Sequence, residues 1–394
     1  MSDGRHMLPG TGQVVLIAPD KFKGSLGAPE VARRIGAGLR RARPEVPLLE
    51  LPVADGGDGT VDAAVAAGFA RVRAEVSGPT GDPVTASYAV RGDVAVVELA
   101  EASGLRHLPG GRLAPLTASS RGTGELIGDA VRRGARRVVL GLGGSACTDG
   151  GAGMAAALGA RLLDADGREL SPGGAALRDL DRVDATALRE RMRGVTVVVA
   201  SDVDSPLLGP DGAAHVFGPQ KGAGPRDVDL LEQALTRLDA VVRRDLGVSA
   251  AERPGAGAAG GAGFGAMAFC SATVEPGITY LLDLLGFSDH LADARLVITG
   301  EGALDHQTLR GKAPAGVARA AAGAGVPVLA VAGRSTLSEE ELRAAGFLGA
   351  YALTDLEPDP ARCMREAGPL LERLAERVGR LWLDDLRDDT AVMP

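Results

Sequence analysis

The stretch VVLIAPDKFKGSLGAPEVARRIGAGLRR, residues 14–41, decides the fold class. Its first five residues form a short apolar run that Pro19-Asp20 ends, and Pro29 to Arg41 then carries apolar residues at helical spacing. A second apolar run, Leu48 to Val53, stops at a Gly/Asp-rich turn that begins at Asp55. Strand, polar turn and helix in this order predict a parallel sheet covered by helices, with ligands beyond the carboxyl ends of its strands.

The pattern of the chain changes near residue 71. Alternating runs at residues 72–76, 85–90 and 94–99, separated by turns, predict antiparallel strands. After a Gly/Ala segment at residues 253–265, which we interpret as loop, strand–turn–helix alternation resumes and ends in a predicted helix at 361–383. Because the two chain ends share one pattern, we predict one discontinuous α/β domain, an inserted mixed α/β domain and two disordered termini. Their bounds are residues 13–68 with 286–385, residues 69–285, and residues 1–12 with 386–394.

Composition and charge exclude several classes of protein. The chain has 394 residues, 45% hydrophobic and 24% charged, which is typical of a globular protein. The net charge is −8 and no run of Lys/Arg is dense enough to follow a phosphate backbone, which argues against nucleic acid as the main partner. Three scattered cysteines, Cys147, Cys270 and Cys363, fit neither a disulfide framework nor a zinc site of standard spacing. No apolar run has membrane-spanning length and the N-terminus has no signal peptide, so we predict a cytoplasmic protein without a membrane partner.

Five loops rich in Gly and Asp follow apolar strands. Glycine lets backbone N–H groups approach phosphate oxygens, and Asp side chains at the same edge can hold Mg²⁺. The loops therefore indicate phosphoryl transfer. A Walker A loop is absent, because Gly311-Lys312 is followed by Ala313 and His306 stands where the first Gly is required.

Alternatives stay open at this level. Gly141–Ala146 fits GxGxxA after a strand and keeps an NAD-dependent oxidoreductase as an alternative, whereas the match at 255–260 follows no strand. A catalytically idle binding protein is a second alternative. Asp202 and Asp204 flank one residue and project to the same side of an extended segment, which suits Mg²⁺ binding, base catalysis or turn formation. Ser145 lacks the GxSxG pattern of a hydrolase nucleophile.

Taken together, these loops resemble the bacterial glycerate kinase family of type I. The resemblance covers Val14 to about Trp382, in order and with matching spacing. The stretches that carry it are IAPDKFKGSL (17–26), LPVADGGDGT (51–60), LGLGGSACTDGGAGM (140–154), SDVDSPLLGPDGAAHVFGPQKGA (201–223), PGAGAAGGAGFG (254–265) and VITGEGALDHQTLRGKAPAGVA (297–318).

The resemblance implies ATP-dependent phosphorylation of D-glycerate to 2-phosphoglycerate, with ATP and Mg²⁺ as cofactors. Phosphorylation at the 3-hydroxyl, and a kinase for another small hydroxy acid, remain alternatives. It also implies a Rossmann-like first domain and an active site in the cleft between the two domains. The implied partners are small-molecule substrates, and a homodimer is the candidate assembly.

By motif position, the resemblance assigns catalysis to Lys23, Asp202 and Asp204, with the two aspartates carrying Mg²⁺ or deprotonating the glycerate hydroxyl. Departures from the family pattern, such as Cys147 and His306, bear on substrate preference more than on reaction type. The implied substrate- and nucleotide-binding residues are Asp20, Lys21, Ser25, Asp55, Gly56, Gly57, Asp58, Gly143, Gly144, Ser145, Asp149, Lys221, Glu301, Asp305, Arg310 and Lys312.

Overall fold

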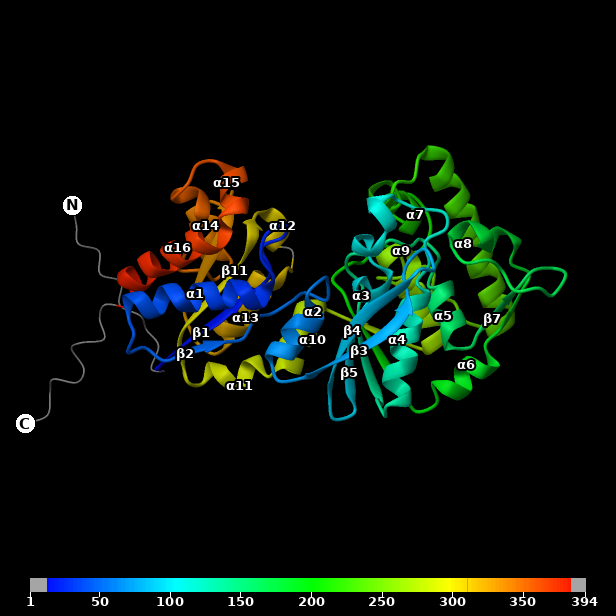
Figure 1. Cartoon of the computed structure of the whole chain (residues 1–394), viewed down its shortest axis with the longest axis horizontal. Coiled ribbons are helices and arrows are strands. Elements are labelled where there is room, and N and C mark those ends of the chain that lie inside the picture. The colour runs from blue at the N-terminus through cyan, green and yellow to red at the C-terminus, as the bar shows by residue number, and fades with distance from the viewer. Residues whose placement is uncertain (1–12, 310, 384–394) are drawn as a thin grey trace, which may run out of the picture. The chain divides into compact units, whose positions relative to one another are not determined.

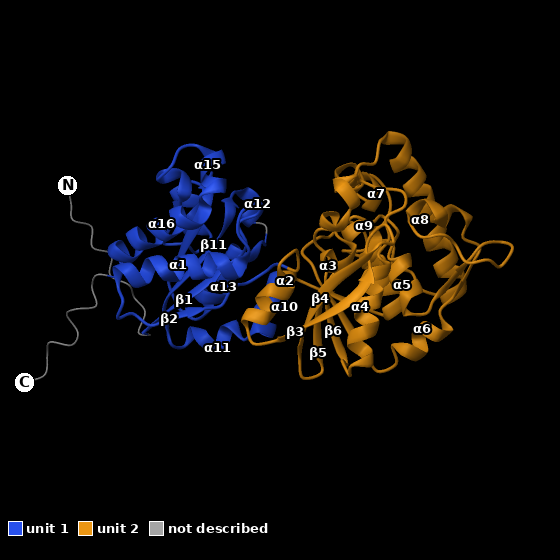
Figure 2. Ribbon diagram, in the orientation of Figure 1, with its two compact units in different colours: residues 1–55, 278–394 blue, residues 56–277 orange. Residues whose placement is uncertain are grey.

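The computed structural model describes residues 13–309 and 311–383 (Figure 1). The chain divides into two compact α/β units: unit 1 comprises residues 1–55 and 278–394, and unit 2 comprises residues 56–277 (Figure 2). The predicted α/β class and the origin of the first unit from both chain ends are confirmed. The predicted disordered termini, residues 1–12 and 386–394, lie outside the described residues.

The unit boundaries lie at 55/56 and 277/278, whereas the sequence placed domain boundaries at 68/69 and 285/286. Helix α2 (Thr60–Ala66) accounts for the first difference, because it packs on strands β4 (Pro83–Arg91) and β5 (Val94–Glu98) of unit 2. Helix α10 (Gly277–Leu285) accounts for the second, because its Ile278 packs against Gly316 of unit 1.

Unit 1 is built on a five-stranded parallel sheet in the order β13-β12-β11-β1-β2. The strands are β1 (Val14–Pro19), β2 (Leu48–Glu50), β11 (Ala294–Leu304), β12 (Val328–Ser335) and β13 (Gly349–Ala352). The helices besides α10 are α1 (Ala28–Ala42), α11 (Phe287–Leu291), α12 (His306–Leu309), α13 (Ala313–Gly323), α14 (Glu339–Ala344), α15 (Pro360–Arg365) and α16 (Ala367–Trp382).

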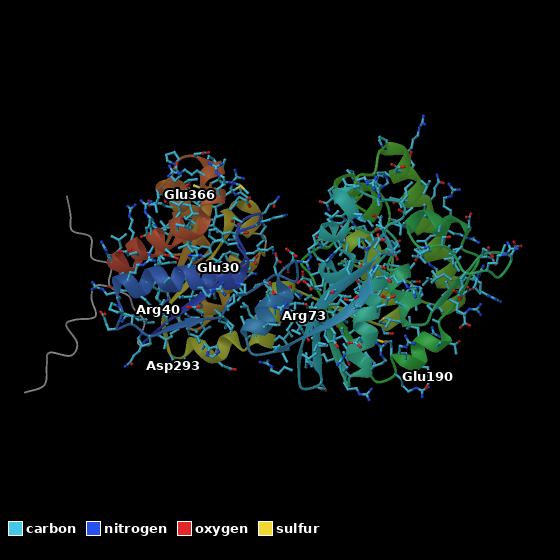
Figure 3. All side chains as sticks on the ribbon, in the orientation of Figure 1. Glu30, Arg40, Arg73, Glu190, Asp293 and Glu366 are labelled. Carbon is cyan, nitrogen blue, oxygen red and sulfur yellow. The ribbon has the colours of Figure 1, made fainter. Side chains whose placement is uncertain are left out.

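Helix α1 shows how the sequence pattern becomes packing. Val31, Ile35 and Leu39 recur every four residues, are fully buried and share one core cluster with α16 and strands β1, β11 and β12. Charged side chains such as Glu30 and Arg40 lie on the outside of this helix (Figure 3). The burial of one apolar stripe therefore orients α1 on the sheet.

Unit 2 contains a six-stranded sheet in the order β10-β9-β6-β5-β4-β3 and a two-stranded antiparallel sheet of β7 and β8. Four neighbouring strands are parallel, and β3 and β4 are antiparallel, as the alternating sequence runs predicted. The remaining strands are β3 (Ala70–Ser77), β6 (Arg137–Gly141), β7 (Arg161–Leu163), β8 (Arg182–Asp184), β9 (Thr196–Ala200) and β10 (Thr273–Glu275). The remaining helices are α3 (Ala100–Ser103), α4 (Arg121–Arg132), α5 (Ala152–Leu158), α6 (Thr186–Arg191), α7 (Ala213–Phe217), α8 (Pro225–Leu246) and α9 (Ala258–Cys270).

Two sequence interpretations need correction. The Gly/Ala segment interpreted as loop includes the start of α9, where Gly260 at φ +71° kinks the helix. A Cβ on Gly263 would lie 2.1 Å from the Gly255 carbonyl oxygen, so glycine here serves close packing. The single helix predicted at 361–383 is two helices, α15 and α16, which meet at Glu366. Within the described residues, no helix combines the length and apolar character needed to cross a bilayer.

Candidate functional site

Three carboxylates gather at the carboxyl edge of the unit 1 sheet. Asp20 directly follows β1, Glu301 lies near the end of β11, and Asp55 follows β2. The backbone N–H of Asp20 donates to the Gly300 carbonyl at 2.8 Å, which aligns two of these strand ends. Only 5% of Asp20 and 7% of Glu301 are exposed. Burial raises the pKa of Asp20 to about 7; the Lys21 ammonium opposes this rise, and the charges of Asp55 and Glu301 add to it.

The loop after Asp20 is a tight turn that exposes polar side chains. Phe22 is buried, and its backbone exchanges hydrogen bonds of 2.8 and 3.0 Å with Leu26. Gly24 makes the turn at φ +84°, a conformation that L side chains rarely adopt. Lys23 and Ser25 are exposed beside it, and the Ser25 hydroxyl donates to the Phe22 carbonyl at 3.0 Å. The buried Phe22 therefore anchors a turn that presents Lys23 to solvent.

Contacts from the following loop fix Glu301. Its Oε1 accepts a hydrogen bond from the Thr308 hydroxyl, and its Oε2 lies 3.5 Å from Nζ of Lys312. Burial raises the pKa of Glu301, while Thr308 and Lys312 oppose the rise. Asp305 accepts backbone N–H groups at the start of α12, so its carboxylate holds that turn. Arg310 lies outside the described residues.

The carboxyl edge of the unit 2 sheet leads into Asp202 and Asp204, which follow β9. Oδ1 of Asp202 accepts the backbone N–H of Gly277 at 3.0 Å. Asp204 is exposed and makes no hydrogen bond or ion pair with a described residue. Across residues 13–309 and 311–383, no group of three or more His, Cys, Asp or Glu side chains is arranged to hold a metal ion. This aspartate pair would therefore need water or substrate oxygens to complete a metal site.

The loop that begins at Gly56 packs across these strand ends. Gly56 has φ +88°, and a Cβ there would lie 2.1 Å from the Ala200 carbonyl oxygen. A Cβ on Gly143 would lie 2.4 Å from Cα of Gly57. The glycines at 56, 57 and 143 thus bring two loops into backbone contact at the end of the sheet, with Asp58 half-buried beside them.

Glu98 is a residue that the sequence analysis missed. It ends β5, is 1% exposed, and its Oε2 accepts the backbone N–H groups of Gly59 at 3.1 Å and Val61 at 3.3 Å. Oε1 is buried without a hydrogen-bond partner among the described residues. Burial raises the pKa of Glu98 to about 8, and the charge of Asp58 adds to the rise. The signal was available, because a lone acid closes an apolar strand here as Asp20 does after β1.

Arg106 was also missed. Its guanidinium lies 3.2 Å from Oδ1 of Asp58 and pairs with Glu101. The neighbouring Leu105 donates its N–H to the Gly144 carbonyl at 3.0 Å. Arg106 therefore connects the loop at Asp58 with the segment that borders Gly144.

Asp149 lies inside unit 2, at 1% exposure. Its carboxylate accepts the Ser120 N–H at 2.8 Å and the Ser120 hydroxyl at 2.9 Å, together with the N–H groups of Gly151 and Gly153. These contacts occupy the side chain, so its observed role is to hold the start of α5. The preceding Ser145 is also buried and bridges to Gly104.

Lys221 lies inside unit 2 as well, at 1% exposure, and its ammonium donates to the Cys147 carbonyl. Burial lowers the pKa of Lys221 to about 8, and the neighbouring Cys147 and Asp149 oppose this fall. A Cβ on Gly260 would lie 2.7 Å from Nζ, so the kinked start of α9 closes over the ammonium. The lysine joins the Cys147 loop to the helices packed around it.

Comparison with known proteins gives consistent results. A family model described as the glycerate kinase family matches residues 15–383. The glycerate kinase of Bacillus subtilis (strain 168) is 47% identical over 322 residues, which are 81% of this chain and 84% of that protein. The glycerate 2-kinase of Escherichia coli (strain K12) is 45% identical over 325 residues, 82% of this chain and 85% of that protein.

A solved structure shares the fold along almost the whole chain. A crystal structure named for glycerate kinase 2 from Salmonella typhimurium LT2 superposes with a TM-score of 0.81 at 42% sequence identity. The match covers 94% of this chain and 98% of that one.

Proposed function

Because the chain belongs to the glycerate kinase family, we propose that it transfers the γ-phosphoryl group of ATP to D-glycerate and forms 2-phosphoglycerate. The observation that carries this proposal is the identity of 45% to a glycerate 2-kinase over 82% of the chain. Phosphorylation at the 3-hydroxyl is the alternative product.

The cations of unit 1 support phosphoryl transfer. The chain has only four lysines, Lys21, Lys23, Lys221 and Lys312, beside 39 arginines. Lys21 and Lys23 lie on the loop that leaves the carboxyl edge of the unit 1 sheet, and Lys312 pairs with Glu301 at that edge. A lysine ammonium is a compact point charge, which suits neutralisation of phosphate oxygens. We assign Lys23, the exposed one, to the transferred phosphoryl group.

The aspartates of unit 2 fit a magnesium site. Mg²⁺ is usually bound through one or two carboxylates together with waters and substrate phosphates, so a cluster of three acids is not required. Asp204 presents an exposed carboxylate without a partner among the described residues, and Asp202 is held by the Gly277 N–H. When bound, Mg²⁺ would neutralise charge on the ATP phosphates. Asp202 and Asp204 are the residues that would hold it.

The other residues at the two sheet edges are proposed contacts for substrate or nucleotide. Lys221 and Asp149 are better assigned to holding the loops of unit 2, because both are buried and engaged within that unit. The proposed contact residues are Asp20, Ser25, Asp55, Gly56, Gly57, Asp58, Gly143, Gly144, Ser145, Glu301 and Asp305; Arg310, which lies outside the described residues, is proposed from its motif position alone.

The geometry of the GxGxxA loop counts against the oxidoreductase alternative. A dinucleotide fingerprint leads directly into a helix whose N-terminus binds the pyrophosphate. Here β6 ends at Gly141 and α5 begins only at Ala152. A Cβ on Gly141 would lie 2.7 Å from the Gly56 carbonyl oxygen, so protein backbone occupies the space beside this glycine.

An ADP-release assay with Mg·ATP and D-glycerate tests the proposal, with the phosphorus position of the product determined by NMR. Glycerate-dependent turnover with a 2-phosphate product supports it. A 3-phosphate product would correct the acceptor position. Turnover only with a different hydroxy acid would refute D-glycerate as the substrate but would still support phosphoryl transfer from ATP. The proposed homodimer and cytoplasmic location need separate measurements, by light scattering of the purified protein and by cell fractionation.

A further inference from the structure

The Asp20 carboxyl stands apart from the other acids of unit 1. It follows β1, which has β11 and β2 as its neighbours in the sheet, and only 5% of the residue is exposed. Oδ1 accepts the backbone N–H of Lys21 at 2.7 Å and lies 3.7 Å from the Lys21 ammonium. No described residue hydrogen-bonds to Oδ2. One oxygen is therefore held by the chain itself, and the other has no hydrogen-bond partner among the described residues and can accept a proton.

Burial of Asp20, modified by the charges around it, suits this carboxylate to accept a proton near neutral pH. Lys21 faces it from its own loop, Asp55 from the segment after β2, and Glu301 from β11, with Lys312 paired to Glu301. Burial and the two acids raise its pKa to about 7 against the opposing effect of Lys21. A general base works best when its pKa lies near the operating pH.

The lysines add an independent argument from position. Lys21 and Lys23 come from the loop that starts at Asp20, and Lys312 pairs with the acid on the neighbouring strand end. If these cations hold the transferred phosphoryl group, the acceptor hydroxyl must approach the same strand ends. Asp20 is the buried carboxylate at the start of that loop.

We propose that Asp20 is the general base of the reaction, a role that rests on the proposed kinase function. Its Oδ2 accepts the proton of the acceptor hydroxyl as that oxygen bonds to the γ-phosphorus. The bond from the γ-phosphorus to the β–γ bridging oxygen breaks, and its electron pair leaves with ADP. After the product departs, Asp20 releases the proton to water. With Asp20 as the base, Asp202 and Asp204 are needed only to bind the metal ion.

Stability supplies a readout that separates this role from a structural one. Because the folded-state pKa of Asp20 is raised above the ordinary value of 3.8, its favourable contribution to folding is present below that value. That contribution is lost as the pH rises through about 7. Asp20→Asn should therefore be at least as stable as the wild type at pH 8, while losing activity. A residue retained at a cost to stability is expected where function requires it.

The experiment measures kcat and the glycerate KM of the full chain between pH 5.5 and 9 for the wild type, Asp20→Asn and Asp239→Asn. Asp239, on α8, is a matched control because it is 6% exposed and plays no part in the proposed chemistry. We expect the wild-type kcat to fall about tenfold per pH unit below pH ~7. The kcat of Asp20→Asn should be lower by about 100-fold or more and should not fall further below pH ~7, with glycerate KM changed less than about threefold. Asp239→Asn should keep the wild-type profile.

Three outcomes would overturn the inference. The first is a wild-type kcat that does not fall below pH 7, a result that needs no variant. The second is an Asp20→Asn variant whose kcat still falls below pH 7. The third is an Asp20→Asn variant with a raised glycerate KM and an unchanged kcat, which would make Asp20 a binding residue. Absence of turnover in the wild type with any hydroxy acid would instead overturn the proposed function, and this inference with it.

Discussion

The Glu98 carboxylate accepts the backbone N–H of Gly59 at 3.1 Å, and this contact ties the end of a buried strand to the loop that carries Asp58. The same oxygen accepts the N–H of Val61, so one acid fixes both sides of Thr60. Because Glu98 is buried, the hydrogen bonds that it makes are shielded from water. The orientation of the Asp58 loop thus depends on a residue outside every motif of the sequence.

Glu98→Gln should alter the pH dependence of stability. The folded-state pKa of Glu98, about 8, is above the ordinary 4.5, so its contribution to folding is full below pH 4.5 and is lost as the pH rises through 8. Gln cannot ionise and keeps an oxygen for Gly59. We expect equal melting temperatures near pH 5 and a variant more stable by about 2 °C or more at pH 9. Thermal unfolding at both pH values checks this, with exposed Glu190→Gln as the control.

Two glycines of α1 should respond in opposite ways to alanine. A Cβ on Gly38 would lie 2.2 Å from the backbone oxygen of Glu372 on α16, which cannot move without separating the helices. A Cβ on Gly36 would meet only the ends of the Glu50 and Arg40 side chains, which can rotate away. Gly38→Ala should cost about 1–3 kcal/mol through overpacking, whereas Gly36→Ala should be neutral or gain up to about 1 kcal/mol from helix propensity.

Urea unfolding of the two variants measures this difference. Equal stability of Gly36→Ala and Gly38→Ala would contradict the close approach of α1 and α16 at Gly38. Retention of the wild-type m-value in both is the control, because it shows that the unfolding transition itself is unchanged.

The sequence predicted which residues lie at the carboxyl ends of the strands better than it predicted which of them are buried. Asp20, Asp55 and Glu301 could be expected to converge, because each follows an apolar run of the sequence and parallel strands end at one edge. Asp149 and Lys221 lie in equally distinctive motifs and yet are buried. Their burial depends on long-range packing, which no local pattern encodes.

The glycine-rich loops show a second limit of the sequence. Glycine at 143 suggested a phosphate-binding backbone, but the close approach observed there is to Gly57 of another loop. A glycine-rich motif indicates that another group comes close to the backbone. It does not identify whether that group is a ligand or a second loop of the protein. For Glu98 the limit is different: its position at the end of an apolar run is visible in the sequence, but only the structure reveals the N–H groups that it binds.

Lys221→Arg should destabilise the protein more than Lys221→Met, although arginine conserves the charge. The ammonium is enclosed between the Cys147 carbonyl and Gly260, so a larger guanidinium would overpack the site. Methionine fits the stem and removes a buried charge, but leaves the carbonyl unpaired at a cost of about 1–3 kcal/mol. Melting temperatures of the two variants at pH 7 test this order of stability. An arginine variant as stable as the wild type would show that the Lys221 ammonium is not tightly enclosed.

Asp204→Asn should abolish most activity without affecting the fold. Its exposed carboxylate has no partner among the described residues, so the melting temperature should stay within about 1 °C of the wild type. If Asp204 holds Mg²⁺, the loss of its charge should lower kcat at least about 100-fold and raise the Mg²⁺ concentration needed for half-maximal rate. A Mg²⁺ titration of ADP release measures both, with exposed Asp211→Asn from the same connection as the control. Near-normal turnover at unchanged Mg²⁺ demand would remove Asp204 from the metal site and leave Asp202 as its remaining carboxylate.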